Sequence, residues 1–166
     1  MIARYRSLAQ RIRTELVDLD RTQDTALRHW QRFRTAASDQ DAFLNSVAFA
    51  LHSLYTDLER LFELVATELD GGALGRDSWH TELLRQMALD LPEIRPPVIQ
   101  ADTARRLDEY RKFRHLVRNV YASNLDAARV ERLVDDLPET WGQVRRDLAD
   151  FSQFLDQLTH ADSARD

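Results

Sequence analysis

Residues 102–121 read DTARRLDEYRKFRHLVRNVY, a stretch without glycine or proline. Apolar residues recur in it at helical spacing and predict a helix with one apolar stripe. At about 100° per residue, Arg114, Arg118 and Tyr121 would fall within an arc of about 60° beside that stripe. A cationic edge next to a buried stripe suits the rim of a groove, so we expect a binding site along this helix.

The basic residues of the chain gather in the same stretch. Residues 105–118 carry six arginine or lysine residues against two acidic ones, a local charge of +4, whereas the whole chain has a net charge of −5. That overall charge disfavours a general nucleic-acid binder, but a basic site on an acidic body could hold a phosphate selectively. A solvated helix face with i,i+4 ion pairs would have the same composition, so charge alone leaves both interpretations open.

The composition is typical of one globular domain over residues 1–166. Hydrophobic residues make up 43% and charged residues 31% of the chain, which is long enough to bury a core. The sequence has neither a membrane-spanning apolar run nor the apolar segment of a secretory signal, so we expect no membrane association and a cytoplasmic location. It has no cysteine, and Asp156 and His160 lack a third ligand, so we expect no metal and no cofactor.

Helical spacing runs through nearly the whole chain, and clustered glycines and prolines mark its interruptions. The pattern predicts five helices and therefore an all-α, up-and-down helical bundle. The expected helices cover about 3–36, Ser38 to Gly71-Gly72, Ser78 to about 89, a helix capped by Asp102, and Asp126 to about Thr159.

Prolines refine this prediction. Pro92, Pro96 and Pro97 predict an extended connection, and Pro138 predicts a kink or break in the last helix. We expect residues 160–166 to be frayed. The apolar stripes widen locally, as at Leu61-Phe62, and this surface could pack within the bundle or against a second subunit; both uses remain open.

Three pieces of the sequence resemble HepT-like proteins. The strongest is FRHLVRNVY at residues 113–121, because the HepT signature is an arginine, four residues, a histidine, any residue and a tyrosine. The others are residues 55–72, which end in ELDGG, and residues 78–87, SWHTELLRQM. HepT toxins belong to the HEPN group of helical endoribonucleases, so the resemblance implies a HEPN-like bundle and a ribonuclease.

The resemblance also implies a composite site for metal-independent RNA cleavage, built across the two-fold axis of a homodimer. Such cleavage uses the RNA 2′-hydroxyl as nucleophile. It needs a cation on the phosphate and a group that moves protons near neutral pH. Arg114 would hold the phosphate, supported by Arg111, His115 and Arg118. Asn119 takes the place of the family's catalytic histidine, and an amide cannot act as a general base.

Loss of a general acid–base group costs on the order of 10²–10⁴-fold in rate, so we expect this chain to be inactive or strongly attenuated. On an ideal helix Asn119 lies about 140° from Arg114. On one straight helix Arg114 and Asn119 would therefore not point at the same phosphate. In a dimer site the two residues could come from different protomers. His115 could carry the proton instead, or be a surface residue. Asn119 could be natural variation or a substitution that allows a lethal protein to be produced.

Tyr121 has a role of its own in the resemblance. HepT toxins are encoded with a minimal nucleotidyltransferase antitoxin, MNT, which transfers AMP from ATP to the signature tyrosine and silences the toxin. The added nucleotide would place bulk and negative charge over the cationic groove. Without the resemblance, Tyr121 could equally be a core aromatic residue. Two other functions remain open: a non-catalytic HEPN-fold binding module that is partner or substrate of a nucleotidyltransferase, and a plain helical interaction protein.

Overall fold

The computed structural model describes residues 2–72, 79–119 and 125–163, and these residues form five helices without a named strand. This confirms the expected all-α, HEPN-like bundle. The helices are α1 (Ile2–Thr35), α2 (Gln40–Leu69), α3 (Trp79–Met87), α4 (Ala101–Asn119) and α5 (Ala127–Ser163). In the described part of the chain, no helix has an apolar stretch sufficient to span a membrane.

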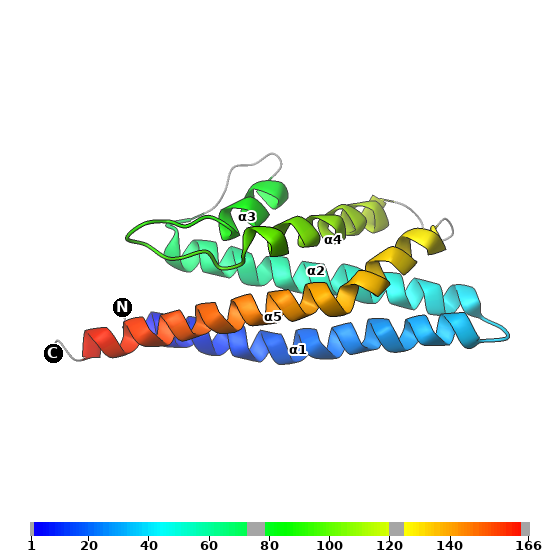
Figure 1. Cartoon of the computed structure of the whole chain (residues 1–166), viewed down its shortest axis with the longest axis horizontal. Helices are drawn as coiled ribbons and strands as arrows, with labels where there is room; N and C mark the ends of the chain where they lie inside the picture. Colours follow the sequence, from blue (N-terminus) through cyan, green and yellow to red (C-terminus); the bar gives the residue numbers. More distant parts are fainter. Residues whose placement is uncertain (1, 73–78, 120–124, 164–166) are drawn as a thin grey trace.

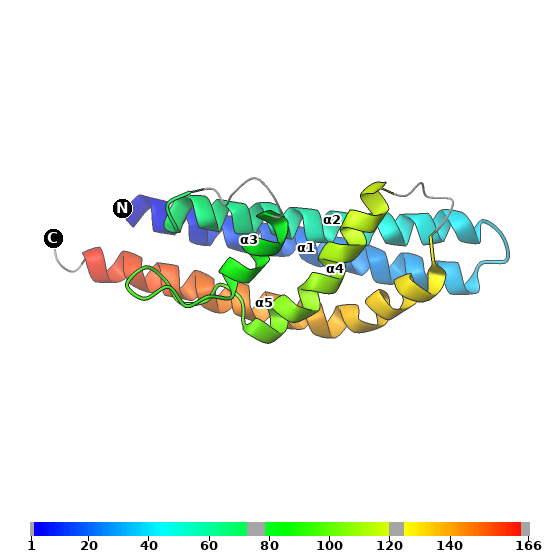
Figure 2. The same ribbon diagram turned by 90° about the horizontal axis from the view of Figure 1, so that it is seen from above.

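Three long helices form the elongated base of the molecule (Figure 1). α1 packs against both α2 and α5 and runs antiparallel to each of them, so the N-terminal end of α1 and the C-terminal end of α5 lie at the same end of the molecule. The short α3 and the oblique α4 lie over this base, and α4 crosses from α5 to α2 (Figure 2). The second layer therefore covers one face of α2.

The core lies where the apolar stripes of the base meet. Full burial of one large apolar side chain contributes roughly 1.5–3 kcal/mol, and each long helix supplies several such residues. The most buried include Ile12 and Leu19 from α1, Leu51, Leu58 and Phe62 from α2, and Leu137, Leu148 and Leu155 from α5. They belong to the apolar stripes, with recurrences at helical spacing, from which the helices were predicted.

The ends of α2 show one error and one success of the sequence prediction. Ser38 does not cap the helix: Asp39 occupies the N-cap in the left-handed region with φ 59°, and its side chain makes no capping hydrogen bond. Gly71 and Gly72 do end it, since they have φ values of 86° and 126°, which glycine adopts readily.

The connection between α3 and α4, where three prolines predicted an extended segment, contains a tight turn at Leu91–Arg95. α3 ends at Met87, whose carbonyl oxygen accepts hydrogen bonds from the backbone nitrogens of Val98 at 2.8 Å and Ile99 at 3.3 Å. Leu91 and Arg95 exchange backbone hydrogen bonds of 3.0 and 2.9 Å across the turn. The expected cap Ser78 lies outside the described residues.

Arg95 holds this turn against the end of α2. Its guanidinium makes two hydrogen bonds of 2.7 Å to the Asp70 carboxylate, and both side chains are buried. The same guanidinium donates to the carbonyl oxygens of Leu89, Pro96 and Gln86. Because each buried charge is paired and hydrogen-bonded, this ion pair fixes the connection that leads into α4.

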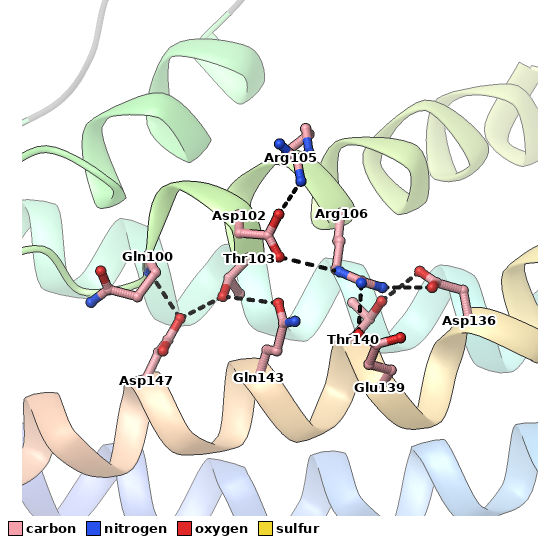
Figure 3. A network of polar contacts seen from close by, with 10 residues as sticks. All are labelled: Gln100, Asp102, Thr103, Arg105, Arg106, Asp136, Glu139, Thr140, Gln143 and Asp147. Carbon is pink, nitrogen blue, oxygen red and sulfur yellow. Dashed lines mark hydrogen bonds and ion pairs between the residues drawn. The ribbon is translucent and has the colours of Figure 1, made fainter.

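α4 begins at Ala101, but Asp102 is not its cap. Asp102 lies inside the first turn, where its carboxylate pairs with Arg105 and Arg106. The capping acceptor is Asp147 of α5, whose Oδ2 accepts hydrogen bonds from the backbone nitrogen of Gln100 at 2.8 Å and from Thr103 Oγ1 at 2.6 Å (Figure 3). A carboxylate from another helix therefore satisfies the start of α4.

A second polar cluster fastens α4 to α5 one turn later. Arg106 donates to Asp136 at 2.6 Å and to Glu139 at 2.7 Å (Figure 3). Tyr110 donates from its hydroxyl to the Leu133 carbonyl oxygen at 2.7 Å. These contacts set the position of α4 along α5 and therefore the place of the residues further along α4.

α5 continues through Pro138 and reaches Ser163, four residues beyond its expected end. The N-terminal part of α5, drawn in yellow, rises away from α1 (Figure 1), and a proline inside a helix favours a kink because it removes one backbone hydrogen bond. Asp126 caps α5 as predicted, because its Oδ1 accepts from the Ala128 nitrogen at 3.0 Å. The helix includes residues 160–163, and its packed face extends as far as the buried Thr159. Fraying of the last residues stays a prediction, since residues 164–166 lie outside the described part of the chain.

Candidate functional site

Arg114 does not line an open rim. It lies on α4 where α4 crosses α2, and the whole residue is only 8% exposed. The expectation of a cationic edge beside the apolar stripe assumed that α4 has one covered face. In the structure α4 packs on α2, on α3 and on α5, so its covered arc is wide enough to include Arg114.

The partner of Arg114 is Glu59 of α2. Arg114 Nη1 lies 2.9 Å from Glu59 Oε1, and the two side chains are only 10% and 4% exposed. A buried arginine requires such a counter-charge, because an unpaired charge in this setting would cost several kcal/mol in stability, on the order of 3–5. Sequence reasoning did not single out Glu59.

The third member of the cluster is His80 of α3. Its Nδ1 lies 2.8 Å from Glu59 Oε2 and 3.0 Å from Arg114 Nη2. One carboxylate therefore holds a guanidinium with one oxygen and an imidazole with the other. We call Glu59, His80 and Arg114 the polar triad; α2, α3 and α4 each contribute one member.

Only one of the two Nδ1 contacts can be a full hydrogen bond, because Nδ1 carries either a proton or a lone pair. With Glu59 ionised opposite Arg114, the consistent tautomer has the proton on Nδ1 and donates it to Glu59 Oε2. The Arg114 nitrogen is then a close neighbour of the ring. Nε2 of His80, which lies 3.4 Å from Arg114 Nη2, keeps its lone pair in the neutral ring.

Tyr55 lies one helical turn before Glu59 and forms the floor of the cluster. The centre of the Arg114 guanidinium stands 5.7 Å from the centroid of the Tyr55 ring, within the range of a cation–π contact. Burial, with the charge of Glu59 as the next cause, raises the pKa of Tyr55 above its ordinary value, so the phenol stays neutral. The buried Arg114 Nε has no hydrogen-bond partner, which leaves one guanidinium donor unused.

Two titratable residues of α2 border the polar triad. Burial, followed by the positive charges of Arg114 and Arg118, lowers the pKa of His52 below its ordinary value. Burial and the negative charge of Glu59 raise the pKa of the Glu63 carboxyl. The field therefore changes sign along α2, from cationic at His52 to anionic at Glu63.

The other predicted site residues are distributed differently. Arg111 is partly buried and pairs with Asp108 at 2.7 Å, while His115 and Arg118 are exposed on α4. Asn119 is the last residue of α4, and its side chain lies outside the described part of the structure, as does the whole of Tyr121. The structure thus brings Arg114 together with two residues that were not predicted.

A sequence signal for Glu59 and His80 did exist. Both lie in the two secondary pieces of the HepT resemblance, residues 55–72 and 78–87. Tyr55, Glu59 and Glu63 follow at steps of four, which places them on one face of a helix. Which carboxylate of that face would meet Arg114 depends on how α4 crosses α2, and local spacing does not contain that information.

Among the described residues, no three histidine or acidic side chains are grouped so that they could hold a metal ion. The ionisable groups around Arg114 include the carboxylates of Glu59 and Glu63 and the imidazole of His80.

In a comparison with protein families, residues 46–155 match the model described as HepT-like protein. Searches of curated proteins and of solved structures give no match. The matched range covers well over half of the chain and contains all three members of the polar triad. This chain therefore belongs to the HepT-like protein family.

Proposed function

We propose that this protein is the toxin of a HepT/MNT toxin–antitoxin pair, an endoribonuclease that acts without a metal. The observation that carries the proposal is the polar triad: the arginine at the signature position of a HepT-like protein is held in place by Glu59 and lies against a histidine.

RNA cleavage by attack of the 2′-hydroxyl places negative charge on the phosphate in the transition state. A guanidinium stabilises that charge best when it is already fixed in place, because no reorganisation is then needed. Glu59 and the Tyr55 ring fix Arg114 in this way. Arg118, exposed on the same helix, adds positive charge for the RNA backbone.

The proposal includes a homodimer with α4 near the two-fold axis. Asn119 ends α4 and is offset from Arg114 by about 140° on an ideal helix. Two copies related by a two-fold axis would bring Arg114 of one protomer near residue 119 of the other. Residue 119 would then act in the site of the partner subunit.

Tyr121 would be the residue through which the ribonuclease is silenced. We propose that an MNT-type nucleotidyltransferase transfers AMP to its hydroxyl and blocks RNA access to Arg114. The support is family membership and the place of Tyr121 in the sequence, at the signature position three residues after Arg118. A nucleotide at that place would carry negative charge toward Arg118 and Arg114.

A second function has its own supporting observation. Asn119 replaces a titratable histidine with an amide, so the chain could be a non-catalytic HEPN-fold module that binds RNA and serves as partner of a nucleotidyltransferase. The two functions share the fold and the modified tyrosine and differ only in cleavage.

The test compares the protein with its Asn119→His variant on single-stranded RNA in the presence of EDTA. We expect both to bind RNA and the variant to cleave faster, on the order of 10²-fold or more, with a pH dependence near neutrality. Incubation of both forms with an MNT enzyme and ATP should add AMP to Tyr121, with Tyr121→Phe as the unmodified control.

Cleavage that EDTA abolishes would contradict a metal-independent reaction. RNA binding by both forms without cleavage by either would favour the binding module. Absence of RNA binding in both forms would exclude both functions.

A further inference from the structure

We infer that His80 is a catalytic residue of this protein and supplies the proton transfer that Asn119 cannot. The inference rests on the proposed ribonuclease function and concerns the same site. The residue that transfers the proton would then lie on α3 instead of α4, and α3 carries no part of the FRHLVRNVY signature.

The first argument is position. His80 Nδ1 lies 3.0 Å from Arg114 Nη2, so a phosphate bound at Arg114 Nη2 would be within reach of the imidazole. General bases act at hydrogen-bond distance from the proton they remove. In RNA the 2′-hydroxyl is adjacent to the phosphate that it attacks, which places this hydroxyl near the His80 ring.

The second argument is orientation. Glu59 binds Arg114 with Oε1 at 2.9 Å and His80 with Oε2 at 2.8 Å. A carboxylate on Nδ1 fixes the tautomer and the ring orientation, leaves Nε2 as the basic atom, and stabilises the imidazolium that forms when Nε2 accepts a proton. Glu59 is therefore a positioning residue for both groups.

The third argument is access. The His80 side chain is 28% exposed, whereas Glu59 is 4% and Arg114 is 10% exposed. The imidazole is thus the member of the polar triad with most access to solvent. The Trp79 ring lies 3.6 Å from the His80 ring, centroid to centroid, and restricts how the imidazole can turn.

The charged groups that face His80 come from two other helices. Glu59 and Glu63 of α2 present two carboxylates, and Arg114 of α4 presents one guanidinium. When His80 gains a proton, Glu59 lies directly against the new charge and offsets the repulsion from Arg114.

The step follows from this geometry. Neutral His80 Nε2 takes the proton of the 2′-hydroxyl, and the 2′-oxygen forms a bond to phosphorus. The bond from phosphorus to the 5′-oxygen breaks, its electron pair stays on that oxygen, and a water molecule protonates it. The products are a 2′,3′-cyclic phosphate and a 5′-hydroxyl, and His80 returns its proton to solvent.

The experiment uses the purified full chain with an RNA oligonucleotide that has one ribonucleotide in a deoxyribonucleotide strand, and it measures binding and single-turnover cleavage separately. In His80→Gln the amide can keep a hydrogen bond to Glu59 but cannot titrate. We expect this variant to cleave on the order of 10²-fold more slowly, with unchanged RNA affinity and without the pH dependence of a group titrating near neutrality. The matched control is His29→Gln, since His29 is also part-buried and contacts Ser46 across two helices, away from the polar triad.

Equal cleavage by the protein and His80→Gln would overturn the assignment. So would RNA binding by the unaltered chain without any cleavage, and in that case the RNA-binding part of the proposed function would stand. Loss of RNA binding in His80→Gln with normal folding would make His80 a binding residue and also overturn it. If Asn119→His accelerates the His80→Gln variant, the ribonuclease function is supported independently of His80.

Discussion

At the scale of single residues, Glu59 is the side chain on which the candidate site depends. It is 3% exposed and contacts two other titratable groups, one from each of two helices. Arg114 and His80 also lie 3.0 Å apart, and Glu59 holds each of them with a different carboxylate oxygen. A substitution of Glu59 on α2 should therefore disturb the site as much as a substitution in the signature on α4.

We predict that Glu59→Gln destabilises the fold strongly. The amide keeps the shape but leaves the buried Arg114 without a counter-charge, and breaking a buried ion pair in this way costs about 3–5 kcal/mol. Denaturant unfolding measures the difference. The control is Asp57→Asn on the same helix, whose pair with Arg60 is solvent-exposed and whose loss should cost less than about 1 kcal/mol. Similar losses in the two variants would show that Glu59 and Arg114 are not a coupled buried pair.

His52 predicts a pH dependence of stability. Its pKa is lowered in the folded state by burial and by Arg114 and Arg118, so the unfolded chain binds a proton at higher pH than the folded protein. Stability should therefore fall as the pH drops through the ordinary value for histidine, about 6.5. Melting temperatures from pH 8 to pH 5 should decline less in His52→Gln than in the unaltered protein. Parallel curves would contradict this role.

At the scale of the elements, the position of α4 decides where Arg114 lies. α4 is attached to α5 at its start by Asp147 and one turn later by Arg106. Arg114 follows two turns further along α4, directly over Glu59 of α2. A change in how α4 begins should therefore reach the site although no catalytic group is altered.

We predict that Asp147→Ala weakens the attachment of α4. It removes the acceptor of the Gln100 backbone nitrogen and of the buried Thr103 hydroxyl, and loss of an N-terminal cap costs about 0.5–2 kcal/mol. Hydrogen exchange should show faster exchange in the first turn of α4 than elsewhere. Asp150→Ala, at an exposed position of the same helix, should leave this turn unchanged. If exchange in the first turn of α4 is the same in both variants, Asp147 does not hold the start of this helix.

At the scale of the whole molecule, the proposed function requires a homodimer. α1, α2 and α5 pack against one another, and α3 and α4 form the second layer over them (Figure 1). Leu116 on α4 is 36% exposed, among the large apolar side chains that the described residues leave accessible.

We predict a homodimer at micromolar concentration that Leu116→Glu converts to monomer, because a charge at the two-fold axis would meet its own copy. Light scattering measures the mass directly. Ile94→Glu is the matched control, since Ile94 is 52% exposed but lies in the connection between α3 and α4. A monomer in the unaltered protein, or dissociation in both variants, would remove α4 from the interface.

The sequence by itself determined the five helices, most of their ends and the signature arginine. Periodicity, glycines and caps such as Asp126 act within a few residues, so a reader of the chain can recognise them. The stop at Gly71-Gly72 and the cap at Asp126 are of this kind. Ser38 and Asp102 show the limit, because a suitable residue near a helix start need not be the one that caps it.

Only the tertiary structure decided what Arg114 meets. Glu59 and His80 are 21 residues apart, and His80 and Arg114 are 34 apart. Asp147 caps a helix whose first residues lie 47 positions before it. Such pairs form because the crossing of two helices brings particular faces together, and the crossing follows from the packing of many apolar side chains at once. Local periodicity defines the faces of each helix, whereas packing selects which of them meet.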